Sequence, residues 1–278
     1  MNTIKNSLKA FERRILDGIV RHFAHGALEA RAEKIVRLFE DQIPRGSRIL
    51  DLGGGWGFYA EPLKKRGHRS LVLDVVKPGY QKAPGVLYDG LRIPFPDQSF
   101  DVTILVTMLH HVPDPRALFE EVRRVTRQKV VVVEDLYHHA AGRFWTLCRD
   151  RILNVEFMEH PHQFRKDGEW REFFQAAGFE VGSFKSFYTW LAGFRILNGI
   201  YVLEPVTKRS LSSPRKRGSR EWIPDFSQRT DPSFGGQAFG NDILSGALIV
   251  FAVLVLVAPG HVWAGGVAAE GELWRSCF

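Results

Sequence analysis

Hydrophobic and polar residues follow two rhythms between residues 45 and 206. Short apolar runs, rich in valine, isoleucine and leucine, alternate with segments in which apolar residues return every three or four positions. The first rhythm is typical of buried strands and the second of helices that cover a sheet. Their alternation predicts an α/β fold with a doubly wound, mostly parallel sheet. The predicted strands are residues 49–52, 70–74, 85–89, 100–106, 129–134, 179–187 and 196–203. The predicted helices are residues 59–66, 114–125, 140–153 and 167–178, and Asp114 and Asp167 are the expected N-caps of the second and the fourth.

Two further helices are expected before the sheet. Residues 8–23 place apolar side chains at helical spacing with basic residues between them, which predicts an amphipathic helix, and a second helix follows over residues 28–39. We interpret residues 1–44 as an N-terminal helical segment that packs on the sheet. A lid over the substrate entrance and a contact with a membrane surface are the open alternatives.

The globular pattern ends near Pro205, and residues 207–278 have a different composition. Residues 208–220 contain six basic residues and no acidic one, mixed with serine, proline and glycine, which is typical of a disordered linker. Residues 243–258 are almost wholly apolar, but these 16 residues are fewer than the roughly 20 that span a bilayer. This tail is interpreted either as a membrane-associated segment or as sequence without function.

The most specific feature is a set of acidic residues at the ends of predicted strands. Asp51, Asp74 and Asp89 lie at the ends of the first three predicted strands, and a glycine-rich loop over residues 53–57 follows the first of them. Open α/β sheets bind ligands at this edge. Glycines let the loop bend sharply and approach a ligand closely, and the N–H groups of the next helix face that ligand. The sequence therefore predicts a cradle for a small molecule.

Taken together in this order, the motifs of residues 45–206 resemble those of the class I S-adenosylmethionine-dependent methyltransferases of the small-molecule type. The matching segments are residues 51–57, Asp74, and residues 89–101, 109–125 and 169–179. The resemblance implies a Rossmann-like, seven-stranded sheet whose last strand is antiparallel. It also implies S-adenosyl-L-methionine as the cofactor of a domain that spans residues 45–206.

The same resemblance implies roles for individual residues. The glycine loop would hold the methionine part of the cofactor with Asp51 near its ammonium group. Asp74 would accept hydrogen bonds from the ribose hydroxyls, because both oxygens of a carboxylate accept. Asp89 would accept from the adenine amino group, and Thr107 would line the other side. The implied cofactor-binding residues are Asp51, Gly53, Gly55, Gly57, Asp74, Asp89 and Thr107.

Two neighbouring histidines are the candidate catalytic residues. His110 and His111 lie just after the fourth predicted strand, where one of them could take a proton from the methyl acceptor. A role in the pocket wall is the alternative. Four more histidines lie between residues 138 and 162, but no paired cysteine or glutamate pattern accompanies them. We therefore predict no metal ligands.

Aromatic residues are frequent in residues 137–164 and 184–194. They belong either to the core or to the wall of an acceptor pocket, where they would suit a small, lipid-like or aromatic acceptor. A nucleic-acid partner is not indicated, because the formal charge of +7 is partly local and no aromatic and basic pattern of an RNA-binding module accompanies it. The two cysteines are far apart, which fits a cytoplasmic protein. Peripheral or tail-anchored membrane association stays open.

Two alternative functions stay open beside methyl transfer to such an acceptor. Residues 55–60 also fit the dinucleotide fingerprint, which allows an NAD(P)-dependent oxidoreductase that uses the same loop. The unusual tail allows a non-catalytic, membrane-associated protein that binds S-adenosylmethionine.

Overall fold

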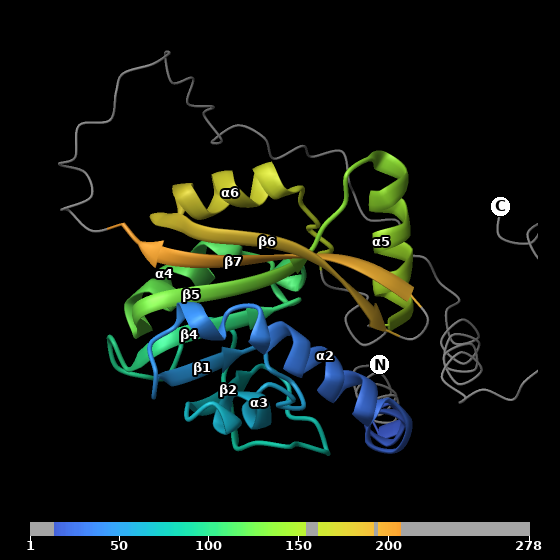
Figure 1. Cartoon of the computed structure of the whole chain (residues 1–278), viewed down its shortest axis with the longest axis horizontal. Coiled ribbons are helices and arrows are strands. Elements are labelled where there is room, and N and C mark those ends of the chain that lie inside the picture. The colour runs from blue at the N-terminus through green and yellow to red at the C-terminus, as the bar shows by residue number, and fades with distance from the viewer. Residues whose placement is uncertain (1–13, 154–160, 192–193, 207–278) are drawn as a thin grey trace, which may run out of the picture.

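The computed structural model describes residues 14–153, 161–191 and 194–206, which form a seven-stranded sheet with helices on both faces (Figure 1). Six of the strands are at least five residues long, and β3 has three residues. The strands are β1 Arg48–Leu52, β2 Arg69–Asp74, β3 Gly85–Leu87, β4 Phe100–Val106, β5 Thr126–Asp135, β6 Phe179–Leu191 and β7 Phe194–Pro205. Every predicted strand is present, and β4 has the predicted bounds.

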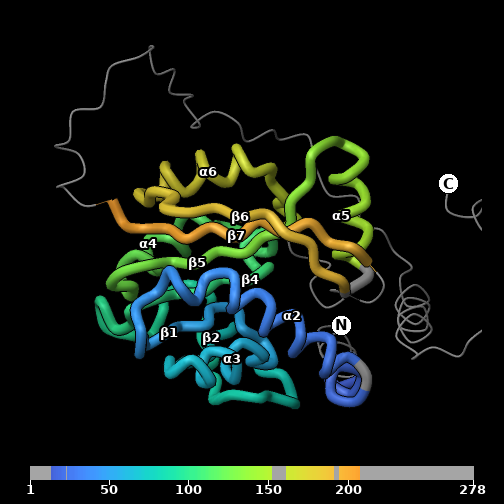
Figure 2. The backbone as a smooth tube through the Cα atoms, viewed as in Figure 1, coloured from blue at the N-terminus to red at the C-terminus, as the bar shows by residue number. Residues whose placement is uncertain are grey.

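The strand order is β3-β2-β1-β4-β5-β7-β6. The strands β3, β2, β1, β4 and β5 run parallel to one another, and β7 is antiparallel to both β5 and β6. The predicted doubly wound sheet with an antiparallel last strand is therefore confirmed. The winding reverses between β1 and β4, and Figure 2 shows the earlier and later parts of the chain on the two sides of this reversal. Ligands bind outside the carboxyl ends of the strands at such a point.

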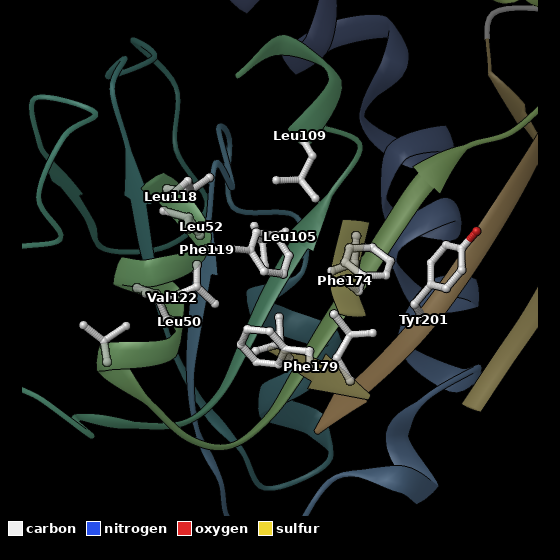
Figure 3. Close-up of a cluster of buried hydrophobic side chains, with 14 of the residues drawn as sticks. Leu50, Leu52, Leu105, Leu109, Leu118, Phe119, Val122, Phe174, Phe179 and Tyr201 are labelled. Atoms are coloured by element: carbon white, nitrogen blue, oxygen red, sulfur yellow. The ribbon is translucent and has the colours of Figure 1, made fainter. Parts of the chain in front are cut away.

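Each face of the sheet carries its own apolar core. On one face, Leu118, Phe119 and Val122 of α4 (Pro115–Val125) pack with strand residues such as Leu50 and with α6 (Asp167–Ala176), as Figure 3 shows. On the other face, α2 (His25–Arg37) and α3 (Ala60–Lys65) pack against Ile49 and the alternate residues of β4 and β5. Successive strand residues point to opposite faces, so both must be apolar, which explains the unbroken valine run of β5.

The helix starts agree with the sequence at one helix and differ at another. Asp114 caps α4 as predicted, because its carboxylate accepts from the N–H groups of Arg116 and Ala117 at 3.0 Å. The sequence predicted Asp167 as the N-cap of α6, and this prediction is wrong. Lys166 holds the cap position, and Asp167 is the first helical residue. The reason is that Glu169 accepts the N–H of Lys166 at 2.7 Å, the reciprocal contact of a capping box.

The two predicted N-terminal helices are joined in the structure. Residues 14–37 are helical throughout, with a π-helical turn, η1 Val20–Ala24, leading into α2. The helix α2 begins at His25 and shares an apolar core with the sheet. The first residues of the amphipathic pattern, the linker and the apolar run of residues 243–258 lie outside the described residues. Among the helices that are described, none combines the length and the apolar character needed to cross a bilayer.

The helix α5 (Ala140–Leu153) has the predicted bounds and stands at one end of the sheet, beside the end of β6 and the start of β7 (Figure 1). The strands of this hairpin are longer than predicted because antiparallel pairing continues from Phe179 opposite Pro205 to Leu191 opposite Phe194. The hairpin and α5 together extend the protein beyond the carboxyl end of β5.

Candidate functional site

The glycine loop connects β1 to α3 at the carboxyl edge of the sheet. Gly53, Gly55 and Gly57 have φ angles of +71°, +50° and +76°, a left-handed backbone that residues with a side chain rarely adopt. The N–H of Gly53 donates to the carbonyl of Leu73 in β2 at 2.7 Å. The loop is thus bent back over the ends of β1 and β2 and presents main chain to the space outside the sheet.

Asp51 lies directly beneath this loop. Its side chain is buried, with 1% of the residue exposed, and neither carboxylate oxygen has a hydrogen-bond partner among the described residues. A Cβ atom at Gly54 would lie 2.5 Å from the carboxylate, so only glycine leaves room for it. Burial, together with the charge of Asp74, raises the pKa of Asp51 to about 7. This carboxylate is poised to ionise when a cation comes close.

Asp74 ends β2 and anchors two loops. Its Oδ2 accepts the N–H of Gly55 at 2.8 Å, and its Oδ1 accepts the N–H of Val76 at 3.1 Å. The negative charge of Asp74 raises the pKa of Asp51 and also the pKa of the Tyr88 hydroxyl. The acidic residue therefore lies at the centre of the predicted edge.

Asp89 lies two residues beyond β3 and is exposed. It accepts the N–H groups of Leu91 and Arg92 at 2.9 and 3.1 Å, and these bonds lower its pKa. Burial raises the pKa of Tyr88 to about 12, and the charges of Asp74 and Asp89 add to this effect, so the three side chains are electrostatic neighbours. Asp51, Asp74 and Asp89 thus follow one another along the carboxyl edge of the neighbouring strands β1, β2 and β3.

The exit of β4 meets the loop from the other side. Thr107 has a φ of +49°, unusual for a residue with a β-branched side chain, and its N–H donates to the carbonyl of Val133 at 2.7 Å. The turn brings the side chain of Met108 against Gly53, where a Cβ would lie 3.0 Å from it. The predicted cofactor-binding residues of β1 and β4 are therefore brought to one place.

His110 and His111 follow in a short 3-10 helix, η3 Leu109–His111, that is held by Glu134 of β5. The Oε1 atom of Glu134 accepts the N–H groups of Met108 and Leu109 at 3.0 and 2.8 Å, and its Oε2 lies 2.6 Å from Nδ1 of His110. Both Glu134 and His110 are buried, with exposures of 0% and 1%. Sequence reasoning missed Glu134, although it lies one residue before the end of β5, as Asp51 does in β1.

On its other side, His110 faces α5. Its Nε2 lies 3.4 Å from Oδ1 of Asp150, a carboxylate that also contacts His162. Burial alone would lower the pKa of His110, but the charges of Glu134 and Asp150 and the hydrogen bond to Glu134 raise it to about 10. The ring of Phe164 stacks on His110 with 4.4 Å between centroids. Asp150 was not identified from the sequence.

A cavity of about 390 Å³ lies between α5, the end of β5 and the β6–β7 hairpin. Tyr137, Trp145, Tyr188 and Phe194 contribute aromatic side chains to its wall, while Arg149 supplies a charge. Of the aromatic residues noted in the sequence, these four line the cavity. Others, such as Phe184, belong to the core.

A buried polar network borders this cavity. Asp135 pairs with Arg149, and its Oδ1 accepts from the side-chain amide of Asn198 at 2.5 Å. Thr189 completes the network by donating to Asn198 at 2.6 Å. These contacts fix the wall between α5 and β7. A second hollow, of about 290 Å³ and lined in part by Arg116 and Gly178, is built from other elements, α4 and the segment after α6.

Residues 50–133, from β1 to β5, match the family described as a methyltransferase domain. Among curated relatives, an uncharacterised methyltransferase of Mycobacterium sp. (strain KMS) is 35% identical over 91 residues, which are 30% of this chain and 36% of the relative. The demethylmenaquinone methyltransferase of Renibacterium salmoninarum is 31% identical over 119 residues, which are 40% of this chain and 50% of that protein. The chain thus spans half or less of the length of these two relatives.

A solved structure shows the same fold. It belongs to the complex between the Haloferax volcanii Trm112 methyltransferase activator and the putative methyltransferase, and it is 18% identical. The match covers 69% of this chain and 98% of the solved chain, with a TM-score of 0.53. Strand order, glycine loop, family match and relatives agree. Residues 50–133 therefore match the methyltransferase domain family, and the described residues share their fold with a solved methyltransferase complex chain.

Proposed function

We propose that this chain transfers a methyl group from S-adenosylmethionine to a small, apolar or aromatic acceptor. The observation that carries the proposal is Asp51. A buried carboxylate without a hydrogen-bond partner among the described residues, under a loop of bare main chain, favours a positively charged ligand. The cofactor has two such centres, an ammonium and a sulfonium group. The residues therefore fit the cofactor that the family uses.

Two further residues support this fit. Asp74 can hold the loop through Gly55 and still accept from a ribose, because a carboxylate has about four acceptor positions. Asp89 is exposed at the same edge of the sheet and accepts from two backbone N–H groups. In our proposal it also accepts from the amino group of the adenine.

The bound cofactor would supply a methyl group that is already activated by its sulfonium charge. The chain then has to align donor and acceptor and to keep them in place, which is the main source of acceleration in such a displacement. The segment after β4 contributes to this alignment, because the side chain of Met108 packs against Gly53 and the N–H of Met108 donates to Glu134. The acceptor would lie beyond this exit.

The role of His110 and His111 as general bases stays a prediction. The two nitrogens of His110 face the buried carboxylates of Glu134 and Asp150, and His111 also faces Asp150. This geometry supports the view that His110 positions the β4 exit. Alignment of donor and acceptor does not require proton transfer by either ring.

The cavity beside α5 is our candidate for the acceptor site. It opens at the carboxyl end of β5, and its aromatic wall suits a flat or lipid-like molecule. Two relatives are demethylmenaquinone methyltransferases, which supports a quinone-type acceptor for this chain. The relatives named above are methyltransferases, which favours methyl over hydride transfer.

Calorimetric titration with S-adenosylhomocysteine tests the proposal before any acceptor is known. We expect saturable binding at one site per chain and no binding of NADH. Binding of NADH without S-adenosylhomocysteine would instead support the oxidoreductase alternative. Binding of S-adenosylhomocysteine with no transfer of radiolabelled methyl to any of a panel of phenols and quinols would support the non-catalytic alternative.

A pair of neighbouring variants tests the acceptor site once an acceptor is found. Trp145→Ala removes an aromatic wall of the cavity, so KM for the acceptor should rise at least about tenfold while affinity for S-adenosylhomocysteine is unchanged. Phe144→Ala is the matched control. Phe144 is as exposed as Trp145, at 60%, but does not line the cavity. Equal effects of the two substitutions would remove the cavity as the acceptor site.

A further inference from the structure

His110, His111 and Asp150 form a cluster that the proposed methyl transfer does not explain. Each residue offers one ligand atom, and these three atoms lie within 4.8 Å of one another. We propose that they bind a divalent transition-metal ion of the zinc type. The inference does not depend on the proposed methyl transfer, because its readout is metal binding.

The distances inside the cluster suit a shared ion better than hydrogen bonds. Nε2 of His110 and Nε2 of His111 lie 3.4 and 3.7 Å from the same oxygen, Oδ1 of Asp150. Two ligands of a tetrahedral zinc ion, each about 2.0–2.1 Å from the metal, are about 3.3 Å apart. Small movements would therefore bring all three atoms to one ion.

His110 has the environment of a metal-binding histidine. Its Nε2 is buried and has no hydrogen-bond partner among the described residues, whereas Nδ1 lies 2.6 Å from Oε2 of Glu134. Metal-bound histidines almost always donate the other ring N–H to a carboxylate or carbonyl, which directs the lone pair of the first nitrogen to the metal. Glu134 would be that second partner. The stacked ring of Phe164 holds the imidazole in its plane.

Asp150 is oriented in the same way. Its Oδ2 lies 2.8 Å from Nδ1 of His162, so Oδ1 is the oxygen that faces His110 and His111. His162 therefore acts as a positioning residue for the carboxylate. The cluster comes from two distant segments, η3 and α5, whose side chains meet beyond the carboxyl end of β4.

The charge of the site also favours a dication. Glu134 and Asp150 bring two buried carboxylates next to the imidazole rings, and a divalent ion would balance their charges. Arg165 acts electrostatically on Glu134, but its guanidinium lies over the ring of Trp170, 5.0 Å from the centroid.

The ligand types select the kind of ion. Two imidazoles and one carboxylate suit zinc and its neighbours in the first transition row, whereas calcium and magnesium prefer oxygen ligands only. Three protein ligands leave a fourth position for a water or an oxygen of an acceptor. The side chain of His111 is 11% exposed and is the most accessible of the three ligands. The ion would enter from that side.

Metal binding is tested with the full chain, purified without a histidine tag and dialysed against EDTA. Cobalt(II) should give a visible absorption band with one equivalent per chain, and zinc should abolish the band by displacing cobalt. Zinc should also raise the Tm of the EDTA-treated protein. Absence of both the cobalt band and the zinc-dependent rise in Tm would overturn the proposal.

Variants then locate the ion. His111→Ala and Asp150→Asn should weaken cobalt binding by more than about 100-fold, and Glu134→Gln by about 10–100-fold. His138→Ala is the matched control, because His138 is exposed and outside the cluster, and should bind cobalt like the wild type. Circular dichroism checks folding, and His111→Gln replaces the alanine variant if that one unfolds. Wild-type affinity in a folded His111 variant would contradict the proposed ligands.

Discussion

The carboxylate of Asp74 accepts a hydrogen bond from the backbone N–H of Gly55, with 2.8 Å between Oδ2 and the nitrogen. The bond joins the carboxyl end of β2 to the loop that leaves β1. The residue that we propose as the acceptor for the ribose hydroxyls therefore also shapes the glycine loop. Loss of its carboxylate should affect the site in two ways.

Asp74→Ala should weaken S-adenosylhomocysteine binding by at least about tenfold, because both the acceptor for the ligand and the anchor of the loop are lost. Asp74→Asn keeps one carbonyl oxygen and should show a smaller loss. Calorimetric titration measures both. Asp41→Ala, at an exposed acidic residue of η2 (Glu40–Gln42), is the control and should bind like the wild type. Unchanged affinity in Asp74→Ala would remove Asp74 from the cofactor site.

The raised pKa of Asp51 predicts a pH dependence of stability. Between pH 4 and pH 7 the folded chain holds a proton on Asp51 that the unfolded chain has lost, so this contribution to stability falls as pH rises through about 7. From pH 5 to pH 8 the loss is about 3 kcal/mol. Asp51→Asn lacks this term. The free energy of unfolding, measured with denaturant at pH 5 and pH 8, should therefore rise for the variant relative to the wild type as the pH increases. Parallel pH profiles of the two proteins would contradict the assignment.

The same carboxylate predicts proton release on ligand binding. Near pH 6 Asp51 is largely protonated, and a cation beside it should drive it to ionise. Titrations with S-adenosylhomocysteine in buffers of different ionisation enthalpy should show close to one proton released per ligand at pH 6 and far less at pH 8. Asp51→Asn should release none at either pH. Equal release by the variant would assign the proton to another group.

Much of the fold follows from the sequence because strand and helix rhythms are local. The apolar run of residues 100–106 predicts β4 with the bounds that the structure has, and Asp114 with Pro115 marks the start of α4. Acidic strand ends are also local signals, and the structure places Asp51 and Asp74 together. Glu134 follows the same rule and could have been recognised from it.

Contacts between distant segments are not encoded in this local way. Asp150 lies 40 residues after His110, and no spacing rule indicates that this face of α5 turns toward the β4 exit. The length of the β6–β7 hairpin depends on cross-strand register, which the periodicity of either strand does not contain. The histidine and carboxylate cluster could therefore be found only in three dimensions.

Gly54→Ala should destabilise the protein through a contact with Asp51. The backbone of Gly54 is not left-handed, so the cost arises from the Cβ that would lie 2.5 Å from the carboxylate. Overpacking of this kind costs about 1–3 kcal/mol. Gly18→Ala, in a helix with open space around it, is the control and should be neutral or stabilising. If Gly54→Ala costs the same in an Asp51→Ala background, the contact with the carboxylate is not the cause.

Glu134 should be the most sensitive of the buried acidic residues. Its carboxylate accepts from the N–H groups of Met108 and Leu109 and contacts the ring of His110, so Glu134→Ala leaves three polar partners unsatisfied, two of them buried. We expect a loss of about 3–5 kcal/mol in the free energy of unfolding, measured in EDTA so that bound metal does not contribute.

The control and a second readout make this prediction specific. Glu204→Ala removes an exposed carboxylate that pairs with Lys129 on the neighbouring strand, and should cost less than about 1 kcal/mol. Because Met108 packs against Gly53, Glu134→Gln should also weaken S-adenosylhomocysteine binding even where the variant stays folded. Glu134→Gln that binds S-adenosylhomocysteine like the wild type would show that the β4 exit holds its place without the Glu134 carboxylate.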